Sequence, residues 1–462
     1  QGAGSSMVNP TRVDSLKDAM EAAELDMVGY CAGYERSGKP NKAYLDEAVS
    51  QAKMADVVIL CIGLDESSES EGLDRTHIGI PTVQKRLLDA VTAVNHNVVA
   101  VVSAGSVIET DWVEKCRAVV HGYLGGQAGA GAMLEVLTGW QNPCGKLAET
   151  IPLRYEDTPA ARYFPGKKQN AEYREGLYVG YRYYETANKA VRYPFGYGLS
   201  YTTFAYSDLK VNADKVTFTI TNTGSVAGAE IAQLYVAKPD ATVFRPAKEL
   251  KGFTKVFLKA GESKTVTIPL DDKTFRYWNV ATDSWEVEGG SYQLLVGANV
   301  QDIRLTADIT LPGTGAPDPY AGKDLAHYRT ARVQEVPDAE FEALLGRSIP
   351  EETTAIDRTM TLGELNHSRS PLCWLIAGVL TLLVRSGEKN GKPNLNILFQ
   401  YNMPLRGLAQ MTGGIIGEET VDGLVMEAKG FWVIGILRAL VGLLQNFVAN
   451  SRYQAKLDEQ SR

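Results

Sequence analysis

The sequence is poor in cysteine and has no excess of basic residues. Its 462 residues include an odd number of widely spaced cysteines, Cys31, Cys61, Cys116, Cys144 and Cys373. This pattern indicates buried thiols in a reducing compartment rather than a disulfide framework or a zinc site. Asp and Glu outnumber Lys and Arg by 55 to 47, which gives a net charge of −8. Because phosphate binding needs a basic surface, this charge argues against nucleic acid as a partner and favours neutral or small polar substrates.

The sequence also opens without an apolar signal region and has no long uninterrupted hydrophobic run, so the true N-terminus with any targeting signal is not expected to lie within it. It begins Q-G-A-G-S-S, without a methionine or an apolar region, which indicates the interior of a longer gene product. Together with the cysteines, this favours a bacterial cytoplasmic location over secretion. The apolar run at 372–384 is too short to span a membrane, and the run at 431–448 contains Arg438. We therefore expect helices that are buried or that dock on another chain, with no membrane span.

No cofactor site is indicated. The glycine-rich segment at 125–131 does not have the G-x-G-x-x-G spacing, and no lysine follows it in a P-loop arrangement. These glycines are better explained by a helix that lies close to a sheet. We expect a protein that works without a cofactor or a bound metal ion.

Residues 1–198 alternate apolar strands with amphipathic helices. Residues 55–64 form a continuous apolar run, typical of a parallel strand covered on both faces, and residues 97–102 and 118–123 supply further strands. A helix is predicted over 82–94, with its apolar residues on one face. This alternation predicts an α/β domain with a mainly parallel sheet sandwiched by helices.

From 199 to 312 the pattern changes to short strands with a period of two. Residues 215–221 alternate strictly, with Val216, Phe218 and Ile220 expected to face a core. Similar segments recur at the spacing of a β-sandwich. The segment G-T-G-A-P-D-P at 313–319 is typical of a linker, so the third predicted unit, 313–462, is a linker followed by a helical C-terminal tail.

The segment S-E-S-E-G-L-D-R at 68–75 directly follows the apolar strand at 55–64. Ligands of open α/β sheets bind at the carboxyl ends of the strands, so a functional loop of such a domain is expected here. A carboxyl group that is desolvated there can hold a proton at neutral pH, which general-acid catalysis requires. From these residues alone, Glu66, Glu69 and Glu71 could equally be solvated charges on a surface loop.

The loop resembles part of a known family. The motif E-G-L-D-R at 71–75, with Ile80-Pro81 and Gln84 downstream, is similar to the second domain of glycoside hydrolase family 3, which includes β-glucosidases, glucan glucohydrolases and β-xylosidases. Further similar stretches follow in the family's order, at residues 125–132, 142–147, 175–184 and 194–201. The resemblance implies a fibronectin type III-like domain at 199–312.

The same resemblance implies retaining hydrolysis of β-glycosides, with terminal β-D-glucosyl residues as the expected substrates. Retaining enzymes use two carboxyl groups about 5–5.5 Å apart, one as nucleophile and one as general acid/base. Glu71 matches the family's acid/base position, and Glu69 is the fallback if the register differs by two. Asp74 and Arg75 are expected to pair with each other or to brace the loop.

The other carboxyl group is not expected on this chain. In the family, the nucleophilic aspartate lies on a (β/α)8 barrel, which needs roughly 200 residues or more of strand and helix repeats. The helical tail has no such repeats. A barrel-bearing partner chain, or a segment removed from this one, would therefore supply the nucleophile and the sugar pocket.

A different class of function also fits the sequence. The chain could be a non-catalytic carbohydrate-binding or assembly module derived from such an enzyme, with the apolar tail as its working part. The run at 431–448 predicts a helix that is apolar around most of its circumference and must be covered. We expect it to pack against the barrel chain or against a second copy in a homo-oligomer.

Overall fold

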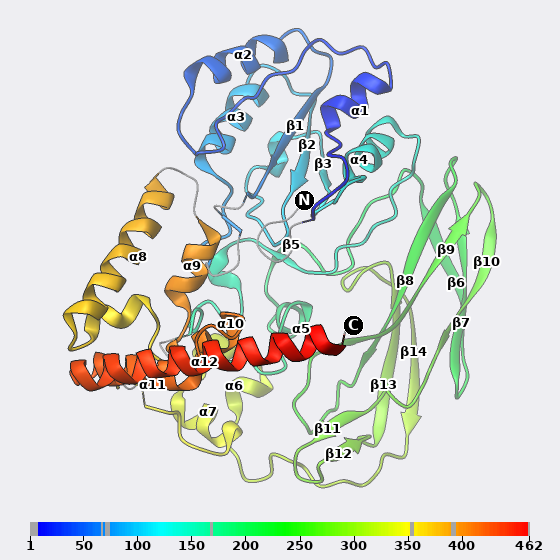
Figure 1. Cartoon of the computed structure of the whole chain (residues 1–462). Coiled ribbons are helices and arrows are strands. Elements are labelled where there is room, and N and C mark those ends of the chain that lie inside the picture. Colours follow the sequence, from blue (N-terminus) through cyan, green and yellow to red (C-terminus); the bar gives the residue numbers. More distant parts are fainter. Residues whose placement is uncertain are drawn as a thin grey trace.

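The computed structural model describes residues 8–65, 68–69, 74–166, 170–351, 355–389 and 394–460. Figure 1 shows an α/β domain, then an antiparallel β-sandwich, then a group of C-terminal helices. This order agrees with the fold class predicted from the sequence.

The α/β domain is built on a parallel sheet in the order β1-β2-β3. β1 (Val58–Gly63) pairs with β2 (Val98–Ser103), and β2 pairs with β3 (Ala118–His121). All three strands therefore end at the same edge, where the loop after β1 begins. This edge is the candidate site that the sequence indicated.

Helices cover both faces of this sheet. α2 (Lys42–Ala52) and α3 (Thr82–Thr92) lie on one side, and α1 (Leu16–Ala22) and α4 (Gly129–Thr138) lie on the other (Figure 1). α3 forms where its apolar residues recur on one face, and it buries Leu87, Leu88 and Val91 against the sheet. The structure thus confirms the parallel sheet with helices on both faces.

The end of β1 requires glycine. Gly63 has φ +153°, and a Cβ atom there would lie 1.9 Å from the carbonyl oxygen of Ser103 on β2. Its amide donates a 2.9 Å hydrogen bond to Oε1 of the buried Gln84 on α3. β1 therefore enters the functional loop at a point fixed by both the neighbouring strand and a helix.

We expect Gly63→Ala to destabilise the α/β domain by roughly 2–6 kcal/mol, because backbone strain and overpacking each cost about 1–3 kcal/mol. The measurement is the urea midpoint of that domain. Gly38→Ala is the matched control, since Gly38 has φ +74° with nothing within 4 Å of its Cβ position. Equal losses in the two variants would show that the contact with Ser103 costs nothing.

The second domain is a β-sandwich. One sheet has the order β10-β7-β6, from β6 (Phe204–Val211), β7 (Lys215–Asn222) and β10 (Ser263–Pro269). As predicted, Val216, Phe218 and Ile220 of β7 are all buried.

The facing sheet of the sandwich has the order β14-β13-β8-β9. Its strands are β8 (Gly228–Ala237), β9 (Glu249–Leu258), β13 (Gly290–Gly297) and β14 (Ile303–Leu311). A core between the sheets includes Leu234, Leu258 and Leu294, which are fully buried.

The segment after the sandwich does not stand apart from it. Residues 318–349, here called the strap, contain α6 (Ala326–Arg329) and α7 (Asp338–Leu345) and return to the α/β domain. Their core includes Tyr178, Tyr183, Tyr184 and Phe244 from the two preceding domains and Leu325, Tyr328, Val333, Val336 and Phe341 from the strap. This part of the predicted tail is therefore packed on the body of the protein.

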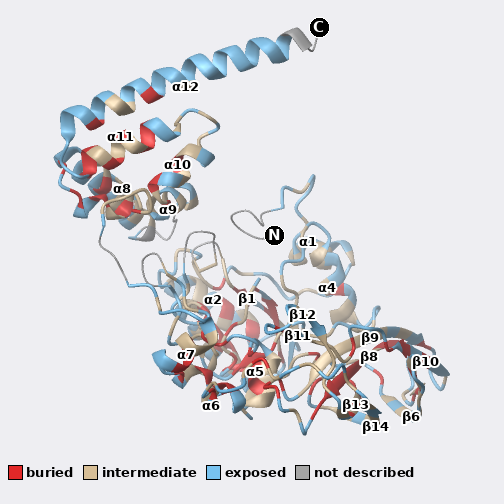
Figure 2. Cartoon of the chain, turned by 90° about the horizontal axis from the view of Figure 1, so that it is seen from below, coloured by how far each residue is buried: buried red, intermediate tan, exposed pale blue. Residues whose placement is uncertain are grey.

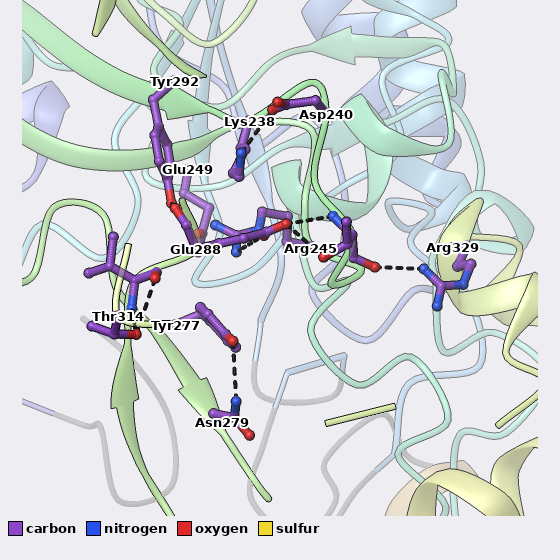
Figure 3. A network of polar contacts seen from close by, with 12 residues as sticks. Lys238, Asp240, Arg245, Glu249, Tyr277, Asn279, Glu288, Tyr292, Thr314 and Arg329 are labelled. Atoms are coloured by element: carbon purple, nitrogen blue, oxygen red, sulfur yellow. Dashed lines mark hydrogen bonds and ion pairs between the residues drawn. The ribbon is translucent and has the colours of Figure 1, made fainter. Parts of the chain in front are cut away.

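Polar contacts to both preceding domains fix the strap. The Tyr178 hydroxyl donates a 2.5 Å hydrogen bond to the carbonyl of Tyr328, and Arg174 forms an ion pair with Asp338 at 2.6 Å. On the sandwich side, Arg329 joins a polar network in which Arg245 pairs with Glu288 at 2.7 Å (Figure 3). The strap thus contacts both preceding domains.

The remaining helices form a separate unit, the helical module (355–460). It contains α8 (Pro371–Lys389), α9 (Leu395–Asn402), α10 (Leu405–Met411), α11 (Glu418–Ala428) and α12 (Trp432–Gln460). Figure 2 shows it as a lobe of its own, with α12 exposed along most of its length. Its own core includes Met360, Leu365, Cys373, Ala377, Leu405, Val421 and Ala428.

The structure gives α12 more length than the apolar run suggested. By length and composition, α12 is long enough and apolar enough to cross a membrane, although Arg438 lies within it. The argument from run length therefore does not by itself decide whether this helix spans a membrane. Its packing against α11 is described below.

The cysteines are less buried than expected. Cys373 is buried in the helical module, Cys31, Cys116 and Cys144 are half-buried, and Cys61 on β1 is exposed. All of them are free thiols. The prediction of buried thiols is thus wrong for Cys61, because β1 is not covered on both faces along its whole length.

Candidate acid/base loop

The loop that follows β1 carries the predicted acid/base residue. Glu71 itself, with Glu66 and the stretch 70–73, lies outside the described residues. The residues on either side of that stretch, Glu69 and Arg75, are described and show how the loop is attached.

Glu69 is held by the turn after β2. Its Oε2 accepts a 2.8 Å hydrogen bond from the Gly105 amide, and its Oε1 accepts a 2.5 Å hydrogen bond from the Ser106 hydroxyl. Both carboxylate oxygens are therefore occupied by donors from one turn. This arrangement suits a residue that attaches the loop to the sheet.

Arg75 reaches the same turn from the other end of the loop. Its Nη1 donates to Ser106 Oγ at 2.6 Å and to the Val107 carbonyl at 3.0 Å. Burial lowers the pKa of Arg75, and the charge of Glu69 acts in the opposite direction. Asp74 is exposed, and no ion pair joins it to Arg75, so of the two residues Arg75 has the bracing contacts.

Ser106 is consequently the common partner of the two ends. Its hydroxyl donates to Glu69 and accepts from Arg75, so one side chain links the residues that precede and follow 70–73. We call these three residues the serine clamp. The sequence analysis missed Ser106, although its position just after β2, at the carboxyl edge of the sheet, was a usable signal.

A second group of polar residues lies near the clamp, after β3. The rings of His121 and Tyr123 are 4.0 Å apart, and Glu149 is close to the Tyr123 hydroxyl. Burial lowers the pKa of His121. Burial raises the pKa of Glu149, the Tyr123 hydroxyl offsets part of this increase, and the charge of Glu69 adds to it.

Some buried atoms of these polar side chains have no hydrogen-bond partner among the residues that the structure describes. They are Nη2 of Arg75, Nδ1 of His121, the hydroxyl of Tyr123 and Oε1 of Glu149. Buried polar atoms are normally paired, and leaving one unpaired costs about 1–3 kcal/mol. The carboxyl edge of the sheet therefore gathers polar groups beyond those needed to hold the fold, as a site for a polar ligand would.

Comparison with known families accounts for this arrangement. Residues 1–201 match the glycosyl hydrolase family 3 C-terminal domain, and residues 230–300 match a fibronectin type III-like domain. The α/β domain is therefore a glycosyl hydrolase family 3 C-terminal domain. Together with the second domain, it corresponds to the α/β and fibronectin type III-like part of a β-glucosidase-like hydrolase.

Curated relatives share this part at high identity. The chain is 44% identical over 326 residues to thermostable beta-glucosidase B of Acetivibrio thermocellus, which covers 68% of this chain and 43% of the relative. It is also 44% identical over 326 residues to an exo-alpha-(1->6)-L-arabinopyranosidase of Bifidobacterium breve, over 69% of this chain and 43% of the relative. The chain thus spans less than half the length of these relatives.

Solved structures extend the similarity. The crystal structure of a family 3 beta-glucosidase from Bifidobacterium adolescentis matches with a TM-score of 0.66 and 39% identity, covering 81% of this chain and 51% of that one. Residues 1–312 make up only about two-thirds of this chain, so the match continues into the segment beyond the sandwich. Part of that segment therefore belongs to the shared architecture.

Proposed function

We propose that this chain supplies the general acid/base of a retaining β-glycosidase that acts on terminal β-D-glucosyl residues. The observation that carries the proposal is the serine clamp, which attaches both ends of the stretch 70–73 to the carboxyl edge of a parallel sheet. Beta-glucosidases among the relatives support the substrate class.

Glu71 would act twice in the reaction. It would first protonate the leaving glycosidic oxygen while a nucleophile forms the glycosyl-enzyme intermediate, and then take a proton from the water that hydrolyses it. Glu69 cannot fill this role while both of its oxygens are held by Gly105 and Ser106. The clamp would keep the loop in place during both steps.

The nucleophile would come from a barrel, on a partner chain or on a segment of the same gene product. This follows from the family resemblance and from the share of the relatives that the chain covers. The barrel would also provide the pocket for the non-reducing sugar. A glucosidase and an arabinopyranosidase are equally similar to this chain, which supports placing sugar preference outside it.

We expect the isolated chain not to hydrolyse 4-nitrophenyl β-D-glucoside or 4-nitrophenyl α-L-arabinopyranoside, because a retaining mechanism without its nucleophile loses the covalent step. Adding a family 3 barrel segment should restore release of nitrophenol from one of them. Turnover by the chain alone, with any barrel shown to be absent by mass spectrometry, would contradict the proposal that the nucleophile lies on a barrel and not on this chain. No turnover under either condition would instead favour a non-catalytic binding or assembly module.

A further inference from the structure

α12 packs against α11 with its small residues inward. Gly435 and Gly442 are buried at this contact, and Cβ atoms there would lie 2.5 Å from the amide nitrogen of Glu427 and 2.6 Å from that of Thr420. The two helix backbones therefore approach closely. The consequence is that the large apolar side chains of α12 have no place in the contact.

The polar groups of α12 are also directed toward α11 and the loop that precedes it. Arg438 forms ion pairs with Glu419 and Asp422, both at 2.8 Å, and the Asn446 amide donates to the Gly414 carbonyl at 3.1 Å. The charge that interrupts the apolar run is therefore neutralised on the inner side of the helix. The opposite side is left without a charged residue from 431 to 448.

That outer side is large and apolar. Val433, Leu444 and Phe447 are 72%, 66% and 71% exposed, along more than three turns of α12. We call this surface the α12 face. Soluble monomers rarely expose contiguous apolar patches larger than a few hundred Å², and larger ones mark sites of interaction with proteins or membranes.

An aromatic and basic cluster lies at the start of the α12 face. The indole of Trp432 donates to the Arg369 carbonyl at 3.1 Å, and the indole of Trp374 on α8 donates to the Ser368 carbonyl at 2.8 Å. Both rings are about half exposed. Arg369 and Lys429 are exposed beside them and form no ion pair with a described residue. Such amphipathic aromatic rings are favoured at the boundary between lipid and water.

The charge of this part of the chain differs from that of the rest. From residue 355 to the end, eleven Lys and Arg exceed nine Asp and Glu, a net charge of +2, whereas the whole chain has −8. Among those acidic residues, Glu418 and Asp422 pair with Arg358, and Glu427 is buried against Ser370. The module as a whole thus has a basic net charge.

We infer that the helical module binds the surface of a membrane that contains anionic phospholipid, with α12 lying in the plane of the interface. The α12 face would enter the boundary of the acyl chains, and Arg369 and Lys429 would contact lipid phosphates. α12 would lie flat rather than across the bilayer, because a crossing would carry Arg438 and its partners Glu419 and Asp422 into the hydrocarbon. A second copy of the chain would bring its own basic cluster against this one, and like charges repel. Lipid phosphates carry the opposite charge. This inference goes beyond the proposed hydrolysis and does not depend on it.

Sedimentation with vesicles tests the inference on the 462-residue chain. We expect the chain to sediment with phosphatidylcholine vesicles that contain a quarter phosphatidylglycerol, with a blue shift of tryptophan emission, and to stay in solution with pure phosphatidylcholine. Arg369→Ala with Lys429→Ala should weaken binding about 30-fold, since each basic residue near an anionic surface contributes a factor of about five.

The double variant Leu437→Glu with Leu444→Glu should abolish binding, because it places charge in the α12 face. Phe253→Glu with Phe257→Glu is the matched control, since these exposed residues lie on β9 of the sandwich, and it should bind as the parent does. Equal binding to neutral vesicles, or no binding to either kind, would overturn the inference. So would a dimer in light scattering that Leu437→Glu with Leu444→Glu dissociates, because the α12 face would then be covered by a second copy.

Discussion

Glu71→Ala should lower kcat/KM for alkyl β-glucosides by about 10²–10⁴-fold in the enzyme completed with its barrel, because these leaving groups need a proton. Aryl glucosides with strongly acidic phenols need little protonation, so formation of the glycosyl-enzyme should be much less affected for them. The measurement is a comparison of kcat/KM across leaving groups of rising pKa. A uniform loss for all substrates would contradict the role of Glu71 as the acid.

Rescue by azide distinguishes Glu71 from Glu69, the alternative acid/base residue. In Glu71→Ala, azide should accelerate breakdown of the glycosyl-enzyme and yield a glycosyl azide, because it attacks without a general base. Glu69→Gln is the matched control, since glutamine can still accept a hydrogen bond from the turn at 105–106. Azide rescue and leaving-group dependence in Glu69→Gln, with neither in Glu71→Ala, would move the assignment by two residues.

Ser106→Ala should reduce kcat for alkyl β-glucosides by about 10²-fold, because it removes the partner shared by Glu69 and Arg75. A displacement of about 1 Å at the reacting groups can cost this much. The loss should again be smaller for activated aryl glucosides, since the clamp acts through the acid. Measuring kcat and KM for both substrate types distinguishes this from a general loss of binding.

Ser106→Thr is the conservative control, because it keeps the hydroxyl that donates to Glu69 and accepts from Arg75. It should recover most of the activity lost in Ser106→Ala. If Ser106→Ala unfolds at the same urea concentration as the parent and keeps full activity on alkyl glucosides, Ser106 has no positioning role. If it is less stable yet shows no dependence on the leaving group, its role is structural only.

Local patterns were sufficient to predict those strands that alternate strictly or form a continuous apolar run. The strict alternation at 215–221 predicted which side chains of β7 face the core, because successive residues of a strand point to opposite faces. The continuous run at 55–64 likewise located β1. It overstated the burial of Cys61, because a single sequence does not show how far the neighbouring helices extend over a strand.

The candidate site was only partly predictable, because its contacts join residues far apart in the chain. Ser106 is 37 residues from Glu69 and 31 from Arg75, and a serine after a strand has no distinctive pattern of its own. The position of the loop at the carboxyl edge of the sheet followed from strand order, whereas its attachment required the register of β1 and β2. Glu71 remains a prediction from the motif.

The strap shows the same limit on a larger scale. The glycines and prolines at 313–319, where the strap begins, are typical of a linker, yet the following residues bury Tyr328 beneath Tyr178, 150 residues away. No periodicity in either segment indicates this pairing. Side-chain burial across such a distance is fixed by the packing of whole domains.

The strap also limits which parts of the protein can move. The α/β domain continues directly into the sandwich, and the strap returns from the sandwich to the α/β domain, so the chain forms a closed circuit through the two. A hinge between them would have to break the Arg174 and Tyr178 contacts as well as bend the direct connection. We therefore expect the α/β domain and the sandwich to move as one rigid unit, without a hinge between them.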